Sequence, residues 1–215
     1  MLDYKGIKFH WLGHDGFKII AGGKSIYVDP YKLAETQQKN DADILLITHN
    51  HFDHLSMDDI KHVACKKTTV VAAKECAEQL KPLGLEVKAV LPGDKLSVQG
   101  VPIEVTASYN TNKTFHPKSD RKVGYVLTLN SVRVYHAGDT DDIPEMEGVR
   151  PDVALVPVSG TYVMTAEEAA KAVDERIKPK LAIPMHYAAI VGTEKDVARF
   201  KELVKACPVE ILAQE

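Results

Sequence analysis

The order of strand and helix patterns along the chain is the feature that most constrains its fold. Each half begins with short strand patterns separated by tight turns. Each half then ends with continuous apolar runs, such as "DILLIT" (43–48) and "DVALVPVS" (152–159), that alternate with helix patterns. A strand that is apolar on both faces has to be covered on both faces. Two sheets packed face to face with helices outside them meet this requirement. The pattern therefore predicts an α/β fold, a four-layer αβ/βα sandwich.

No strong repeat and no low-complexity linker separates the two halves, so we expect a single domain over residues 1–215. Two helix starts are marked by a capping-box spacing, in which Ser56 and Thr165 each stand three residues before an acidic residue. A further helix is expected in "KECAEQLKPLG" (74–84), ended by Pro82 and Gly84, after an apolar strand pattern.

Composition excludes several classes of protein. Of the 215 residues, 45% are hydrophobic and 27% are charged, and a formal net charge of −3 gives no signature of nucleic-acid binding. The apolar runs are only strand-sized, so we expect no membrane span. The first residues do not resemble a secretory leader, and the three cysteines show no CxxC spacing. We therefore expect a cytoplasmic protein, and a homo-oligomer is compatible with the sequence.

The segment "HNHFDH" (49–54) directly follows one of the apolar runs and crowds His49, His51, Asp53 and His54 into six residues. Neutral imidazole and carboxylate are the groups that bind zinc and related divalent ions. Alternate side chains at the end of a strand can point to a common place. His49 and His51 can thus share one ion, while Asp53 and His54 turn toward a second. A solvated turn is the simpler alternative, and the density of ligand types argues against it.

These four residues cannot complete two coordination spheres, so further ligands have to come from other strand ends. The candidates are His116 in "TFHPK", Asp139 in "HAGDT" and His186 in "IPMHY". Each has an ordinary alternative, since Asp139 could cap a turn and His186 could be a core histidine. His136 competes with His116, although strand alternation favours a place for His136 beside the site.

Four other residues are candidates for supporting roles. His14, in a turn flanked by glycines, could contact the substrate, orient a ligand or simply form the turn. Asp29 in "VDP" could hold the second ring nitrogen of a ligand histidine, or form an Asx-turn before the proline. Asn112 and Lys113 lie near His116, where Lys113 could bind an anionic group of the substrate or be solvated.

The loop "HNHFDH", with the downstream histidines and aspartate, resembles the metallo-β-lactamase superfamily of binuclear hydrolases. The branch it resembles most is that of ascorbate-6-phosphate lactonases and N-acylphosphatidylethanolamine-type phospholipases. "WLGHDGFKI", "VDPY" and "YHAGDTD" resemble companion motifs of that branch, so the similarity covers nearly the whole chain. It implies two divalent ions, zinc or alternatively Mn²⁺ or Fe²⁺. The implied ligands are His49, His51 and His116 for the first ion, Asp53, His54 and His186 for the second, and Asp139 as a bridge.

Such a site implies hydrolysis by a hydroxide that bridges the metals, with Asp53 and Asp139 as the catalytic carboxylates. Two divalent ions, two carboxylates and one hydroxide leave a net positive site, which lowers the pKa of bound water. The chain has no GxSxG elbow, Walker loop or dinucleotide fingerprint. We therefore expect the substrate to be an anionic small molecule with an ester-like bond, a phosphodiester or a lactone.

Two alternatives come from other functional classes. A di-iron redox protein on the same fold resembles this chain, but that branch carries a glutamate where His51 stands, and a flavin domain would be expected downstream. A non-catalytic metal-binding homologue is disfavoured, because no ligand position is degraded.

Overall fold

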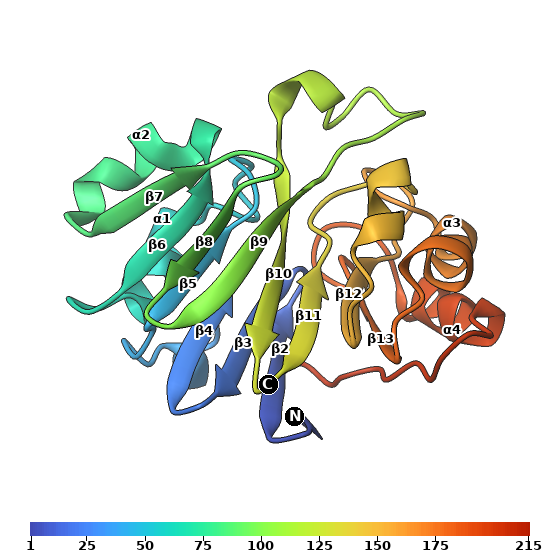
Figure 1. The fold of residues 1–215 in the computed structure, drawn as a ribbon, viewed down its shortest axis with the longest axis horizontal. Helices are drawn as coiled ribbons and strands as arrows, with labels where there is room; N and C mark the ends of the chain where they lie inside the picture. Colours follow the sequence, from blue (N-terminus) through green and yellow to red (C-terminus); the bar gives the residue numbers. More distant parts are fainter.

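A computed structural model describes all residues, 1–215, and consists of two sheets with helices on their outer sides (Figure 1). The first sheet has seven strands in sequence order, antiparallel from β1 to β4 and parallel from β4 to β7. Its strands are β1 (Leu2–Tyr4), β2 (Ile7–Gly13), β3 (Gly16–Ala21), β4 (Lys24–Val28), β5 (Ile44–Ile47), β6 (Thr69–Ala73) and β7 (Glu86–Val90).

The second sheet has six strands in the order β13-β12-β11-β10-β9-β8. Pairing is antiparallel from β8 to β11 and parallel from β11 to β13, so each sheet changes from antiparallel to parallel along the chain. The strands are β8 (Lys95–Val98), β9 (Val101–Ala107), β10 (Val123–Leu129), β11 (Val132–His136), β12 (Val153–Pro157) and β13 (Leu181–Met185). The predicted α/β sandwich is confirmed.

The helices lie outside the sheets, and all but the last connect parallel strands. They are α1 (Met57–Val63), α2 (Ala77–Leu80), α3 (Ala166–Lys171), which continues as a π-helical segment (Ala172–Ile177), and α4 (Glu194–Leu203). Figure 1 shows α3 and α4 beside β13. Ser56 and Thr165 cap α1 and α3 as predicted, because their side chains accept from the amides of Asp59 and Glu168.

The expected helix over 74–84 is instead broken into three short pieces, the 3₁₀ turn Lys74–Cys76, α2, and the 3₁₀ turn Lys81–Leu83. Pro82 lacks an amide hydrogen and cannot continue the helical bonds, and Gly84 then leaves with a φ of +63°. The remaining 3₁₀ turns are Glu35–Gln37, Lys118–Asp120 and Pro144–Gly148. No helix is both long and apolar enough to cross a bilayer.

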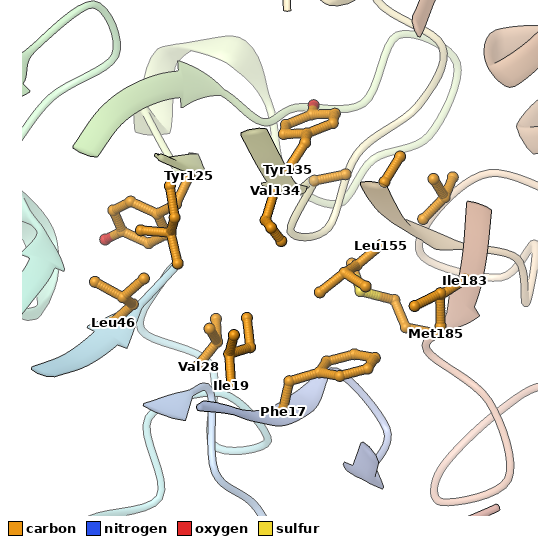
Figure 2. Packing of buried hydrophobic residues seen from close by; sticks show 14 of the residues in the cluster. Phe17, Ile19, Val28, Leu46, Tyr125, Val134, Tyr135, Leu155, Ile183 and Met185 are labelled. Atoms are coloured by element: carbon orange, nitrogen blue, oxygen red, sulfur yellow. The ribbon is translucent and has the colours of Figure 1, made fainter. Parts of the chain in front are cut away.

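The hydrophobic core fills the space between the two sheets. Figure 2 shows Phe17, Ile19 and Val28 of the first sheet facing Val134 and Leu155 of the second. These side chains belong to one cluster of 65 buried residues that draws on both sheets. The core fixes the spacing of the sheets, and therefore the position of the loops that leave the strand ends.

The loops that carry the candidate residues gather at one edge of this sandwich. In parallel sheets the carboxyl ends of neighbouring strands face the same way, and functional groups collect there. His49 follows β5, Asp139 follows β11 and His186 follows β13 directly. Strands β10 and β11 pack closely near this edge and leave no room for a side chain at Gly124, where a Cβ would lie 2.7 Å from the carbonyl oxygen of His136.

Candidate metal centre

Strand β5 delivers the loop 49–54 to this edge, and the loop folds back on itself. The amides of His54 and Leu55 both donate to the carbonyl of His51, at 3.1 and 2.8 Å. Ser56 then ends the loop by capping α1. Within this turn His49 and His54 are fully buried, while His51 and Asp53 are partly exposed. A short local segment therefore holds ligand-type side chains at different depths of the same edge.

The first group of ligands consists of His49, His51 and His116. His51 Nδ1 lies 3.0 Å from His49 Nε2 and 3.1 Å from His116 Nε2. Two nitrogens that share a tetrahedral zinc ion, at bond lengths near 2.0–2.1 Å, are about 3.3 Å apart. Three imidazole nitrogens of this spacing are suited to one ion.

Asp139 lies between this group and a second one. Its Oδ2 is 3.5 Å from His116 Nε2 and 3.3 Å from His186 Nε2, and its Oδ1 is 3.4 Å from His54 Nε2. Asp53 Oδ2 is 3.7 Å from the same His54 nitrogen. The structure thus brings all seven predicted ligands together, with the Asp139 carboxylate facing both histidine groups.

Several atoms that face the centre of the site are buried and have no protein partner, namely His54 Nε2, His186 Nε2 and Asp139 Oδ1. Buried polar atoms are nearly always hydrogen-bonded, so a group of unpartnered ones needs an explanation. Divalent cations supply one, because they bind imidazole nitrogens and carboxylate oxygens directly. The donor set therefore fits metal ions.

The opposite ring nitrogens of the buried histidines are held by the fold. The Asp29 carboxylate accepts from Thr48 Oγ1 and from His54 Nδ1, the latter at 2.9 Å. Because the Thr48 hydroxyl donates to Asp29, its lone pair accepts from His49 Nδ1 at 3.0 Å. Each bond places a proton on Nδ1 and leaves Nε2 free to bind a cation.

His116 and His186 are anchored in the same way by residues after β12. His116 Nδ1 donates to the carbonyl oxygen of Tyr162 at 3.1 Å, and His186 Nδ1 lies 2.7 Å from Ser159 Oγ. Asp29 was predicted from the sequence, whereas Thr48, Ser159 and Tyr162 were not. The only signals in the sequence were the position of Thr48 next to His49 and that of Ser159 after the apolar run 152–158.

Burial and charge set the protonation of the histidines in the metal-free site. Burial lowers the pKa of His49 well below its ordinary value and that of His116 to about 4. Burial also opposes the charged forms of His54 and His186. The carboxylate of Asp139 outweighs burial, so that the pKa of His54 is raised well above 6.5 and that of His186 to about 9. The first group is thus neutral, while the second shares protons with its carboxylates.

His14 and Asp15, in the turn between β2 and β3, also reach the site. His14 Nε2 lies 3.0 Å from Asp53 Oδ2, so this histidine positions a predicted ligand. Asp15 was not predicted from the sequence; it is fully buried, and its Oδ2 lies 3.6 Å from His54 Nε2. Its position beside His14 after a strand was the available signal.

His136 is excluded from the ligand groups, as strand alternation suggested. It ends β11, and its Nε2 lies 2.9 Å from the backbone carbonyl of Asp15. Its Nδ1 accepts from the amide of Gly138 at 3.3 Å. With both ring nitrogens engaged by the backbone, His136 supports the edge of the sheet, and His116 takes the place in the first group.

Two predicted substrate contacts are corrected by the structure. Lys113 forms an ion pair with the buried Asp141 and lies 3.5 Å from Glu168. Asn112 is exposed and donates to Glu168 at 3.1 Å. Neither residue lines the cavity over the histidines. Because Asp141 and Glu168 already neutralise Lys113, this lysine is not placed to bind a substrate anion.

A cavity of about 480 Å³ opens over His51, His116 and Asp139. Its wall also contains the side chains of Asn50, Phe52, Asp53, Phe115, Tyr162 and Ile190. Phe52 and Phe115 are 68% and 47% exposed, so the entrance is largely apolar. A cavity of similar size, about 460 Å³, lies over β9 and β10 and contains none of the histidines.

Comparisons with known proteins agree with this geometry. A beta-lactamase superfamily domain matches residues 8–186. A UPF0173 metal-dependent hydrolase of Thermoplasma acidophilum is 33% identical, over 98% of this chain and 96% of its own. A crystal structure from Parabacteroides distasonis, assigned as a metal-dependent hydrolase, is 33% identical with a TM-score of 0.82, over 95% of this chain and 92% of that one.

A more distant structure, the di-iron β-hydroxylase CmlA of Streptomyces venezuelae, has a TM-score of 0.79 at 16% identity. The match covers all of this chain and 54% of the CmlA chain. At this low identity it shows a shared fold alone. The superfamily domain, by contrast, spans most of the sequence, and the similar relatives match it almost from end to end. The chain therefore belongs to the metallo-β-lactamase superfamily.

Proposed function

We propose that this metal-dependent hydrolase of the metallo-β-lactamase fold works with two divalent ions. The observation that carries the proposal is the position of Asp139. Its two carboxylate oxygens face His116 and His186 at 3.5 and 3.3 Å and His54 at 3.4 Å. It therefore lies between the first group of imidazoles and the unpartnered nitrogens of His54 and His186. A buried carboxylate in that position would bridge two cations.

The residues that would hold the ions are those named above. The first ion would be held by His49, His51 and His116, the second by Asp53, His54 and His186, and Asp139 would be shared. Two bound divalent ions lower the pKa of water, so that hydroxide forms near neutral pH, and they polarise the oxygen of the bond to be cleaved. Imidazole and carboxylate ligation accepts Zn²⁺, Mn²⁺ or Fe²⁺, and zinc is our first expectation.

The chain contributes the orientation of the ligands. Asp29, Thr48, Ser159 and the Tyr162 carbonyl hold the rings of four histidines, so each ring keeps one nitrogen for the centre. Fixing rotamers in advance avoids reorganisation during the reaction. We propose that Asp139 and Asp53 are the catalytic carboxylates, and that His14 keeps Asp53 turned toward the site.

The cavity indicates the kind of substrate. Its volume of about 480 Å³ suits a small molecule, and none of its nine lining residues is a lysine or an arginine. We propose an anionic substrate with an ester-like bond, a phosphodiester or a lactone, whose anionic group contacts the ions. Phe52, Phe115 and Ile190 at the entrance favour an apolar or aromatic group next to that bond.

The three cysteines are free, as in a reducing compartment, and we propose a cytoplasmic location.

The test begins with metal content and continues with activity. Reconstituted protein should hold two equivalents by elemental analysis and should hydrolyse phosphodiesters or lactones in a panel of substrates. His51→Ala should lose both metal and activity, whereas His62→Ala, at an exposed histidine of α1, should lose neither. Full hydrolysis with one equivalent would refute the binuclear proposal. Iron with oxygen-dependent turnover and no hydrolysis would favour the redox alternative.

A further inference from the structure

Asp15 is a buried carboxylate that the proposed function does not use. It lies with His14 in the turn between β2 and β3, and its side chain is 0% exposed. Neither of its carboxylate oxygens has a hydrogen-bond partner. Buried polar atoms are nearly always hydrogen-bonded, so a buried carboxyl group with no hydrogen-bond partner calls for an explanation.

The backbone, rather than the side chain, holds Asp15 in place. Its carbonyl oxygen lies 2.9 Å from His136 Nε2, and the carbonyl of the preceding His14 accepts from Trp11 Nε1 at 2.9 Å and from the amide of His186 at 3.1 Å. The turn is therefore clamped without any contribution from the carboxylate. A purely structural role would not require an acidic side chain here.

The surroundings of the carboxylate are those of a cation site. His14, Asp15, His54 and His186 each offer a ligand atom, and these atoms lie within 4.8 Å of one another. Asp15 Oδ2 is 3.6 Å from His54 Nε2, which is also buried and unpartnered, as is His186 Nε2. Three unpartnered polar groups from three different loops thus face the same point.

We propose that Asp15 is an additional ligand of the second ion, which makes this site richer in oxygen than the first. This inference rests on the binuclear function proposed above. The second site would combine the imidazoles of His54 and His186 with carboxylates from Asp15, Asp53 and Asp139. The first site has three imidazoles and shares only Asp139.

The difference in ligands has a consequence for metal choice. Imidazole suits zinc, whereas carboxylate oxygen suits harder ions such as Mn²⁺. The second site should therefore bind Mn²⁺ relatively better than the first does. The additional carboxylate also reduces the net positive charge that the ions would otherwise leave at the site.

The experiment titrates metal-free protein with Mn²⁺, followed by electron paramagnetic resonance, and with Zn²⁺ in competition with a chelator. The variants are Asp15→Asn, which keeps the shape of the side chain, and Asp15→Ala. Asp43→Asn is the matched control, because Asp43 is a buried carboxylate at the opposite end of β5. We expect both Asp15 variants to weaken the second Mn²⁺ equivalent at least tenfold, to weaken Zn²⁺ there less, and to leave the first equivalent unchanged.

Thermal unfolding separates this role from a structural one. The Asp139 carboxylate lies close enough to raise the pKa of Asp15, and the neutral amide of Asp15→Asn removes this repulsion, so the metal-free variant should melt at or above the wild-type temperature. Its stabilisation by Mn²⁺ should nevertheless be smaller, by about 1.4 kcal/mol for each tenfold loss of affinity. A structural role would instead lower the melting temperature of the metal-free protein and leave the gain from Mn²⁺ unchanged.

The outcomes distinguish this inference from the proposed function. Two equivalents bound with wild-type affinities by both Asp15 variants would overturn the role of Asp15 and leave the binuclear function intact. A wild type that binds one equivalent, weakened by the Asp15 variants, would overturn the binuclear function alone. A wild type that binds one equivalent, with an affinity that the Asp15 variants leave unchanged, would overturn both the role of Asp15 and the binuclear function.

Discussion

Replacing Asp29 by asparagine would test how the fold prepares the histidines for metal. The carboxylate of Asp29 accepts three hydrogen bonds, from Thr48 N at 2.9 Å, from Thr48 Oγ1, and from His54 Nδ1 at 2.9 Å. Through the Thr48 hydroxyl it also determines that His49 Nδ1 carries a proton. One buried carboxylate therefore controls a histidine of each ligand group.

Asparagine has nearly the same shape but only one accepting oxygen. Its amide nitrogen, placed against His54, would donate to Nδ1 and move the ring proton to Nε2, the atom needed for the ion. Residues that orient metal ligands typically contribute 10–100-fold in affinity. This corresponds to about 1.4–2.7 kcal/mol. The loss of one hydrogen bond to a charged group should also lower the free energy of unfolding by about 1.5–3 kcal/mol.

The assay measures both effects on the same protein. Metal affinity comes from competition with a fluorescent chelator, and stability from urea unfolding of the metal-free form. Asp43→Asn serves as the control, because Asp43 accepts from the amide of Ser25 at 2.8 Å and pairs with Lys67. The control should lose stability and keep wild-type affinity, whereas Asp29→Asn should lose both.

One result would refute this reasoning. If Asp29→Asn unfolds more easily but binds metal as the wild type does, Asp29 only holds the backbone of the turn. The ring orientation of His54 would then be set by packing alone. If affinity falls for both ions, the bonds through Thr48 act as proposed.

Three further predictions follow from the same contacts. Asp139→Ala should abolish turnover and reduce bound metal, measured by elemental analysis. Its metal-free melting temperature should also fall at neutral pH, because Asp139 raises the pKa of His54 and His186 and its loss leaves their charged forms without a counter-charge. Lys113→Ala should cost about 1.5–3 kcal/mol in urea unfolding, since the buried Asp141 loses its ion pair but keeps the bonds from the amides of Thr111 and Asn112. It should not alter the ratio of kcat/KM for matched anionic and neutral substrates. The pKa of His186 is raised to about 9 by Asp139, against the effect of burial, so metal-free stability should fall between about pH 6.5 and 9. Metal affinity should rise over the same range, because the proton has to leave; calorimetry at several pH values measures both.

The sequence by itself determined the local parts of this protein. Strand-sized apolar runs indicated the two covered sheets, and the loop "HNHFDH" indicated a metal site, because neighbours at the end of one strand cannot lie far apart. The caps at Ser56 and Thr165 were also readable, since each depends on a residue three positions away. Over 74–84 the stop at Pro82 and Gly84 was readable, but the division of the helix into 3₁₀ and α pieces was not.

Tertiary structure decided everything that depends on which distant segments meet. Whether His116 or His136 joins the loop depends on the register of β10 and β11, which places His136 against the backbone of Asp15. The pairing of Lys113 with Asp141 and the burial of Asp15 beside His54 join residues 28 and 39 positions apart. Local patterns do not encode such pairings, because they arise only when the packed core sets the separation and orientation of the two sheets.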